Sequence, residues 1–129
     1  QANKSVKQSK VVILGITFKE NAPDIRNSRV IDIIDKLKEY GIQQIVADPV
    51  ADEKEARRVY AINLVKINEI KDADCLVFAV AHDEFKKLTF EKLDRLFGNF
   101  DNKEKILIDV KSIFDKNKVE RKGYSYWRL

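Results

Sequence analysis

Three short, uninterrupted apolar runs constrain most strongly what this chain can fold into. They are Lys10–Ile16, Cys75–Ala81 and Lys105–Val110. A short continuous apolar run bounded by polar residues is typical of a strand in a parallel sheet that is covered on both faces. The runs therefore predict three buried parallel strands, with the most apolar one, Cys75–Ala81, at the centre of the sheet.

Segments of helical periodicity separate these runs. After Ser28, which can cap a helix, apolar residues recur at helical spacing as far as Gly41, a residue typical of a helix end; they are Val30, Ile31, Ile33, Ile34 and Leu37. Residues 42–47 predict a second strand that Pro49 ends, because proline lacks the N–H needed for further pairing. Helical segments are also predicted at 51–59, 67–71 and 88–97, whereas 61–65 is either a short strand or an extended connection.

Strands that alternate with helices predict a doubly wound α/β domain, a mainly parallel sheet with helices on both faces. The 129 residues suffice for one such domain, which we place at residues 10–118. Residues 1–9 are expected to form a flexible N-terminal segment and residues 119–129 a loose C-terminal tail. The aromatic residues of that tail are expected to pack rather than to bind a ligand.

The charge balance bears on the partners of the chain. The 25 basic and 21 acidic residues give a formal net charge of +4 and are largely interspersed. This balance suits a phosphate-bearing ligand, and no basic-aromatic pattern indicates a nucleic acid. No apolar run approaches the roughly 20 residues that cross a bilayer, so we expect no membrane contact and a cytoplasmic location. The lone cysteine, Cys75, lies in an apolar run and is expected to be structural.

The loops after the predicted strands are where a ligand is expected, because open α/β sheets bind ligands beyond the carboxyl ends of their strands. The loop at residues 17–28 is the richest in polar groups. Phe18 offers a flat face for a base or ribose, Lys19 an ammonium group and Arg26 a bidentate fork for phosphate or carboxylate. The residues alone leave a second interpretation equally open, in which Asp24 and Arg26 brace the loop and Phe18 packs into the core.

Other polar residues follow the remaining strands. Lys111 directly follows the last apolar run and is expected over the same edge of the sheet, although a solvated lysine is an ordinary feature there. For His82 and Asp83 we favour a loop or helix-capping role over acid–base catalysis, since no nucleophile or metal cluster accompanies them. Gly15 stands alone where a dinucleotide-binding loop needs three glycines, so the chain is not a self-sufficient NAD-binding domain. No residue spacing predicts a metal site.

The run from Leu14 to Ser28, LGITFKENAPDIRNS, closely resembles the start of the C-terminal, UDP-binding domain in the UDP-glucose/GDP-mannose dehydrogenase family. Further motifs occur downstream in the family's order, and they are Tyr40-Gly41, Asp48-Pro49, the run AVAHDEF at 79–85 and Ile108-Asp109-Val110-Lys111. The resemblance covers about residues 10–118. Asn21 and the Asp-Val-Lys sequence at 109–111 are more similar to the branch that oxidises UDP-N-acetylhexosamines than to the UDP-glucose branch.

The resemblance implies a part in an NAD-dependent UDP-sugar 6-dehydrogenase, which oxidises the sugar C6 alcohol to a carboxylate for surface polysaccharide synthesis. It implies that Phe18, Lys19 and Lys111 contact the UDP-sugar and that Arg26 reaches toward NAD across a domain cleft. Many UDP-glucose enzymes carry arginine at the last position, where Lys111 offers only a point charge. The NAD-binding domain and catalytic cysteine of the family belong to an N-terminal portion that this sequence lacks. We therefore assign no catalytic residue here and expect the isolated chain to be inactive.

The same resemblance implies two partners, a UDP-sugar and the remainder of the dehydrogenase chain, with the full-length enzyme a homodimer or higher oligomer. The alternative from another functional class is a non-catalytic interaction or regulatory module that keeps the fold without useful ligand affinity. Measurable binding of UDP distinguishes the two.

Overall fold

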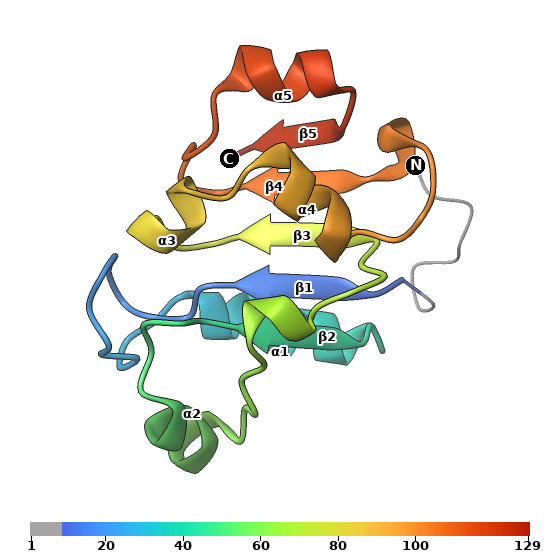
Figure 1. The fold of residues 1–129 in the computed structure, drawn as a ribbon. Helices are drawn as coiled ribbons and strands as arrows, with labels where there is room; N and C mark the ends of the chain where they lie inside the picture. The colour runs from blue at the N-terminus through green and yellow to red at the C-terminus, as the bar shows by residue number, and fades with distance from the viewer. Residues whose placement is uncertain (1–8) are drawn as a thin grey trace.

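The structure, a computed structural model, describes residues 9–129 and is built on a five-stranded sheet (Figure 1). The strands are β1 (Val11–Leu14), β2 (Gln44–Ala47), β3 (Cys75–Phe78), β4 (Ile106–Asp109) and β5 (Ser125–Arg128). Every neighbouring pair is parallel, and the order across the sheet is β2-β1-β3-β4-β5. The prediction of a doubly wound parallel sheet with the Cys75 run at its centre is confirmed.

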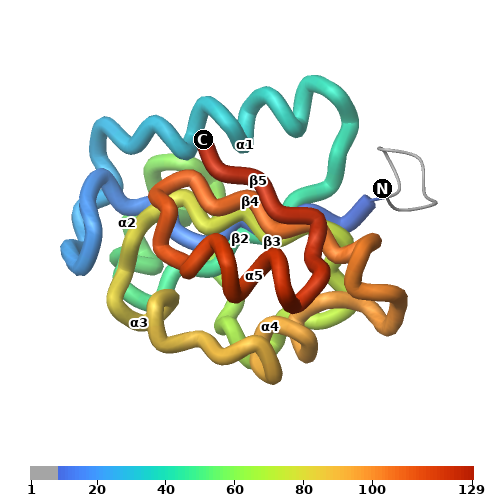
Figure 2. The backbone as a smooth tube through the Cα atoms, turned by 90° about the horizontal axis from the view of Figure 1, so that it is seen from above, coloured from blue at the N-terminus to red at the C-terminus, as the bar shows by residue number. Residues whose placement is uncertain are grey.

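The helices lie on both faces of the sheet but are shared unevenly. They are α1 (Val30–Glu39), α2 (Glu53–Tyr60), α3 (Asp83–Lys86), α4 (Phe90–Leu96) and α5 (Lys116–Lys122), with 3-10 turns η2 (Ile67–Glu69) and η3 (Asn102–Glu104). Figure 2 shows α3, α4 and α5 on one face and α1 on the other, while Figure 1 shows α2 below the β2 edge. Right-handed crossovers produce this division, because the chain crosses the sheet in one direction from β1 to β2 and in the other from β3 to β5.

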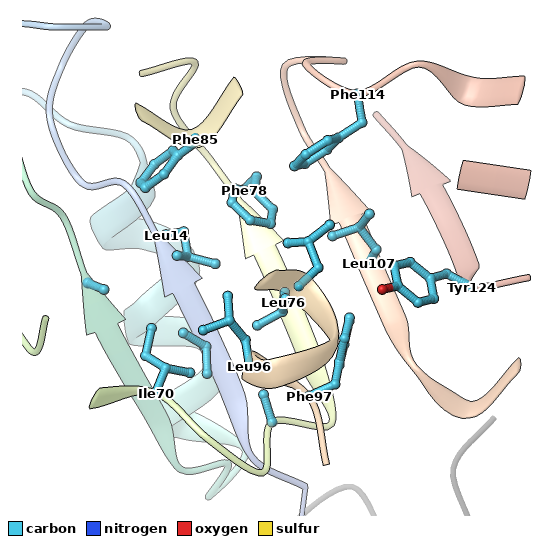
Figure 3. Close-up of a cluster of buried hydrophobic side chains, with 14 of the residues drawn as sticks. Leu14, Ile70, Leu76, Phe78, Phe85, Leu96, Phe97, Leu107, Phe114 and Tyr124 are labelled. Atoms are coloured by element: carbon cyan, nitrogen blue, oxygen red, sulfur yellow. The ribbon is translucent and has the colours of Figure 1, made fainter. Parts of the chain in front are cut away.

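An apolar layer covers each face of the sheet. In the layer under α3, α4 and α5, the ring of Phe78 makes edge-to-face contacts with Phe85 and Phe114 at centroid distances of 5.3 and 4.9 Å (Figure 3). Such ring pairs add stabilisation beyond the area they bury. The layer under α1 includes Ile13 of β1 and Ile34 of α1. Strand β3 is buried along its whole length because it lies between both layers and between two other strands.

The predicted helices and connections occur with shifted ends. Ser28, the expected cap, precedes the N-cap residue Arg29 by one position, although its Oγ accepts a hydrogen bond from the Val30 N–H at 3.3 Å. Gly41 follows the end of α1 with a φ of 72°, a conformation that favours glycine. Residues 61–65 form an extended connection, since their pairing is limited to an isolated bridge between Ala47 and Val65.

The expectation of a loose tail at 119–129 is wrong, because α5 and β5 extend the domain almost to the last residue. Tyr124 is buried, and its hydroxyl donates to the Asp94 carboxylate at 2.6 Å. The Tyr126 hydroxyl donates to Asp109 at 2.7 Å, so the prediction that the tail aromatics pack holds for both tyrosines, but it is wrong for Trp127, which is 61% exposed. The predicted flexible segment at residues 1–9 lies outside the described residues except for Ser9.

Asp94 of α4 ties the C-terminal segment to the rest of the domain. Its carboxylate lies 2.8 Å from the Lys122 Nζ and 3.0 Å from the Lys105 Nζ. Burial alone would raise the pKa of Asp94, but hydrogen bonds from Lys122, Tyr124 and Lys105 outweigh burial and lower the pKa to about 2. A lowered pKa in the folded state stabilises the fold above the unfolded-state pKa, and this stabilisation is lost as the pH falls through the folded-state value.

Asp94→Asn is therefore expected to lower the free energy of unfolding at neutral pH by about 1–2 kcal/mol. It is also expected to flatten the decline of that free energy between about pH 4 and about pH 2. Denaturant unfolding of both proteins across this range measures the effect, with Asp35→Asn, at an exposed position of α1, as the control. Equal acid sensitivity in the Asp94 variant and the parent would contradict this role of Asp94.

Candidate functional site

The carboxyl ends of β1, β3 and β4 surround a hollow of about 340 Å³. The chain runs from β1 through α1 to β2 on one side, while β3 lies on the other, so the loops that follow β1 and β3 diverge. Ligands of open α/β sheets bind at such a switch point. The residues that line the hollow are Thr17, Phe18, Lys19, Glu20, Arg29, Val30, Ile33, Ala79, Val80, Val110 and Lys111.

The three residues predicted to contact a substrate, Phe18, Lys19 and Lys111, all line this hollow. Phe18 is 59% exposed, so it does not pack into the core as one of the two interpretations of its loop required. A large aromatic ring in solvent is available for stacking against a planar ligand group. Lys19 and Lys111 are exposed as well, and the fold brings them together although they follow different strands.

Arg29 is a cation of the hollow that the sequence analysis missed. It is exposed at the N-cap position of α1, where the free N–H groups and the positive end of the helix dipole favour an anion. Its place directly after Ser28, the expected start of the helix, is the signal that could have identified it. Lys19, Arg29 and Lys111 face a single acidic lining residue, Glu20, so the hollow suits an anionic ligand.

Arg26 lies outside this group. Its guanidinium pairs with the Asp24 carboxylate through Nε and Nη2, each at 3.0 Å, and both side chains are largely exposed. The hydrogen bond from Arg26 lowers the pKa of Asp24, and the same bond raises the pKa of Arg26. Arg26 thus pairs with Asp24 within the loop, as the bracing interpretation expects, while the cofactor contact of Arg26 stays a prediction.

Behind the hollow, His82 and Asp48 form a buried network. Both side chains are completely buried. His82 Nδ1 accepts the Asn21 N–H at 2.9 Å, which places the ring proton on Nε2, 3.1 Å from Asp48 Oδ2. Asp48 Oδ2 also accepts the Ile16 N–H at 2.7 Å. Burial alone would raise the pKa of Asp48, but hydrogen bonds from His82 and Ile16 outweigh burial and lower it.

This network fixes the loop that carries Phe18 and Lys19. Asn21 is held twice, because its N–H binds His82 and its side-chain oxygen accepts the Asp83 N–H at 3.0 Å. The Thr17 hydroxyl lies 3.3 Å from His82 Nε2 and donates to the Lys19 carbonyl at 2.9 Å. A loop fixed in this way holds Phe18 and Lys19 in place before any ligand arrives, which reduces the ordering cost of binding.

The helix-capping role that we favoured for His82 is confirmed, but only its main chain performs it. His82 occupies the N-cap position of α3, and its carbonyl accepts the Phe85 N–H at 3.0 Å, whereas its side chain makes no cap hydrogen bond. The imidazole belongs instead to the network with Asp48. Because the ring is inaccessible to a bound molecule, acid–base chemistry by His82 has no structural support.

Cys75 is buried, and this burial, with the nearby Asp74 carboxylate, raises the pKa of its thiol to about 12. Such a thiol is not a nucleophile at neutral pH, so the expectation of a structural cysteine is confirmed.

Residues 9–129 contain no group of three or more histidine, cysteine or carboxylate side chains placed to hold a metal ion. No helix in that range combines the length and the apolar character that crossing a membrane requires.

A second hollow, of about 640 Å³, lies beside Asp48 on the β2 side of the sheet. Besides Asp48, its lining includes the acidic residues Glu53, Glu69 and Glu84 and one cation, Lys66. This excess of negative charge disfavours a phosphate-bearing ligand. The smaller hollow around Lys19 is therefore the better candidate for an anion.

Known proteins resemble this chain in sequence and in fold. Residues 12–116 match the sequence model of the UDP-glucose/GDP-mannose dehydrogenase family, UDP binding domain. The chain is 37% identical over 126 residues to protein CapL from Staphylococcus aureus, covering 96% of this chain and 28% of that protein. It is 41% identical over 112 residues to the UDP-N-acetyl-D-glucosamine 6-dehydrogenase of Salmonella typhi, covering 84% of this chain and 25% of that enzyme. The chain thus spans about a quarter of the length of these curated relatives.

A solved structure supports the fold. The NDP-N-acetyl-D-galactosaminuronic acid dehydrogenase of Methanosarcina mazei Go1 matches with a TM-score of 0.82 at 20% identity, over 98% of this chain and 26% of that one. The family match covers most of the chain and includes Phe18, Lys19 and Lys111. The chain therefore belongs to the UDP-glucose/GDP-mannose dehydrogenase family, in which it corresponds to the C-terminal UDP binding domain.

Proposed function

We propose that this chain is the UDP-sugar-binding domain of an NAD-dependent UDP-sugar 6-dehydrogenase. The observation that carries the proposal is the convergence of Phe18, Lys19 and Lys111 on one hollow at the switch point of the sheet. The three residues lie within the segment that matches the family's UDP binding domain.

The chemistry of the hollow fits the parts of a UDP-sugar. Lys19, Arg29 and Lys111 supply positive charge for the diphosphate, with the N-terminus of α1 as a further source of positive potential. Phe18 supplies a face on which the uracil or the ribose stacks. Val30 and Val80 give the hollow an apolar wall, which excludes water from one side of the ligand.

Within the full enzyme, this domain positions the substrate and the preceding part of the chain performs the chemistry. Binding energy from the UDP group holds the sugar so that its C6 alcohol meets the reacting groups, a use of remote contacts that raises the rate at the reacting centre. NAD is the proposed oxidant, bound mainly by the other part of the enzyme, and Arg26 is the proposed contact from this chain. The isolated chain is accordingly expected to produce no NADH from a UDP-sugar and NAD.

A UDP-N-acetylhexosamine is the proposed substrate class, and surface polysaccharide synthesis in the cytoplasm is the proposed setting. Identity supports the substrate class, because the chain is 41% identical to a UDP-N-acetyl-D-glucosamine 6-dehydrogenase and 28% identical to the UDP-glucose 6-dehydrogenase of Rhizobium meliloti. A homodimer or higher oligomer is the proposed state of the full-length enzyme.

Titration of the isotope-labelled chain with UDP tests the proposed binding site. Amide shifts are expected in the loops around Lys19 and Lys111, and Lys19→Ala and Lys111→Ala are each expected to raise the Kd for UDP about tenfold, equivalent to about 1.4 kcal/mol. Lys118→Ala, at an exposed position of α5 outside the hollow, is the matched control and is expected to leave the Kd unchanged. Repeating the titration with UDP-N-acetylhexosamines and UDP-glucose ranks the sugars.

Three outcomes would contradict the proposal or a part of it. If the lysine variants and the control bind UDP equally well, the hollow is not the binding site. If no residue shifts at millimolar UDP in the chain or in a full-length relative carrying its hollow residues, the alternative of a non-catalytic interaction module is favoured. Steady NADH production by the purified chain would contradict the division of labour between this domain and the rest of the enzyme.

A further inference from the structure

The face of the sheet that carries α1 is less completely covered over β4 and β5 than over β1 and β3. One row of paired residues crosses this face from β1 to β5, and it is Ile13, Val77, Ile108 and Trp127. Exposure along the row rises from 0% at Ile13 through 7% at Val77 to 61% at Trp127, with Ile108 partly exposed. The exposure therefore increases with distance from α1, which lies level with β1 and β2 in Figure 1.

The opposite face does not share this gradient. The corresponding row is fully buried at Val12, Leu76 and Leu107, and its β5 member, Tyr126, is only partly exposed where Trp127 is 61% exposed. The contrast within β4 is direct, because Leu107 is buried under the helices of that face while its neighbours Ile106 and Ile108 are partly exposed. The difference lies in what covers the strands, since α3, α4 and α5 all lie on one face (Figure 2).

The incompletely covered area is apolar. We define the open half of the α1 face as Ile106 and Ile108 of β4, Val110 at its carboxyl end, which also borders the hollow, and Trp127 of β5. None of the four side chains is charged, and Trp127 is the single tryptophan of the chain. An apolar strand of a parallel sheet is normally covered by a helix on each face, so this surface is incomplete as it stands.

The connections between the strands cannot supply the missing cover. Within residues 9–129, α1 is the helix over this face, and the connections after β3 and β4 place their helices on the other one (Figure 2). The chain enters the sheet close to the open half, because the Lys10 carbonyl accepts the Asp74 N–H and the Asp74 carbonyl accepts the Ile106 N–H. Lys10 is thus two strands from Ile106, roughly 10 Å at ordinary strand spacing.

We propose that the open half of the α1 face binds an amphipathic helix from the part of the dehydrogenase chain that precedes this domain. The proposal rests on the proposed function, since it takes the chain to be part of a longer enzyme. The curated relatives supply such a part, because the matched segment is their C-terminal domain and accounts for 25–28% of their length. Burial of apolar area holds the helix, because the open half offers no charge for an ion pair.

Thiol labelling tests this proposal. The part of CapL that precedes its matched segment is joined ahead of residue 9, and this longer chain is compared with the 129-residue chain. Each carries Trp127→Cys on the open half or Lys118→Cys on α5 as the matched control. Maleimide labelling is read at each position by mass spectrometry, and the buried thiol of Cys75 is expected to remain unlabelled.

Labelling at position 127 is expected to be about tenfold slower or more in the longer chain, since a docked helix must open locally before the thiol reacts. Labelling at position 118 is expected to be equal in both chains. Equal labelling rates at position 127 in the two chains would overturn the proposal. If labelling at position 127 of the short chain slows as its concentration rises, the surface binds a second copy of the chain and not a helix of the preceding part, which would also overturn the proposal. UDP titration of the same longer chain is read separately, so protection without UDP binding would support the docking surface and contradict the proposed function.

Discussion

Replacing Asp48 with asparagine is expected to lower the free energy of unfolding by about 3 kcal/mol, because at least two buried donors lose their acceptor at a cost of about 1–3 kcal/mol each. The carboxylate accepts hydrogen bonds from a buried ring and several main-chain N–H groups, and the donors are His82 Nε2 and the N–H groups of Ile16, Thr17, Val50 and Ala51. An asparagine amide turns an NH₂ group toward donors on one side. Buried donors left without an acceptor carry their full desolvation cost.

The acid dependence of stability should change in the same variant. The pKa of Asp48 is lowered in the folded state, where hydrogen bonds from His82 and Ile16 outweigh the effect of burial. The carboxylate therefore stabilises the fold above its unfolded-state pKa, and this contribution is lost as the pH falls through the lower folded-state value. Asp48→Asn is expected to lack that part of the acid-induced loss.

Urea unfolding at neutral and acidic pH measures both effects, with Asp35→Asn on the exposed side of α1 as the control. The control is expected to change the free energy of unfolding by less than about 0.5 kcal/mol, as surface substitutions ordinarily do. Amide spectra should also show the loop at 17–21 perturbed in the Asp48 variant, because the network fixes Asn21. A variant as stable as the parent would show that the buried network contributes little to the fold.

Gly15→Ala is expected to lower the free energy of unfolding by about 3 kcal/mol, because strain and steric overlap act together there. Gly15 has a φ of 102°, in the left-handed region that residues with a side chain rarely adopt. A Cβ atom at this position would lie 2.7 Å from the Val80 Cβ and 3.0 Å from the Val80 main-chain nitrogen. The nitrogen belongs to the backbone, so the overlap cannot be relieved by a change of rotamer.

Gly123→Ala is the matched control for this substitution. Gly123 has a similar φ of 93°, but a Cβ atom there would meet the Asn102 Cβ only at 3.7 Å, an ordinary contact distance. The control is therefore expected to cost about 1–2 kcal/mol, the strain alone. Thermal unfolding of both variants separates the two causes, and equal losses would mean that Val80 yields without cost.

The Gly15 substitution should also weaken binding of UDP, because Val80 lines the hollow. A shift of this wall changes the shape of the site without altering any of its charges. UDP titration of Gly15→Ala at a temperature where it is folded measures this effect. A Kd unchanged from that of the parent would place the apolar wall outside the contacts that hold the ligand.

The sequence by itself determined the architecture and most of the residues that line the candidate site. Apolar runs of strand length separated by helical periodicity specify a parallel sheet, because a residue buried on both faces has to be apolar whatever its partners are. The position of Lys19 and Lys111 after two such runs predicted that they would meet, since parallel strands end at one edge. Arg29 was missed because a charged residue at a helix start is ordinary, and only the shape of the hollow distinguishes it.

The tertiary structure decided what depends on contacts between distant segments. The segment after Asp115 has few apolar residues, and it forms α5 and β5 because Tyr124 and Tyr126 reach Asp94 and Asp109. The role of His82 depends on Asp48 and Asn21, which lie far from it in the sequence. The open half of the α1 face likewise cannot be predicted from the apolar pattern of β4. Periodicity predicts which residues are buried, but it does not predict which helix or strand covers them.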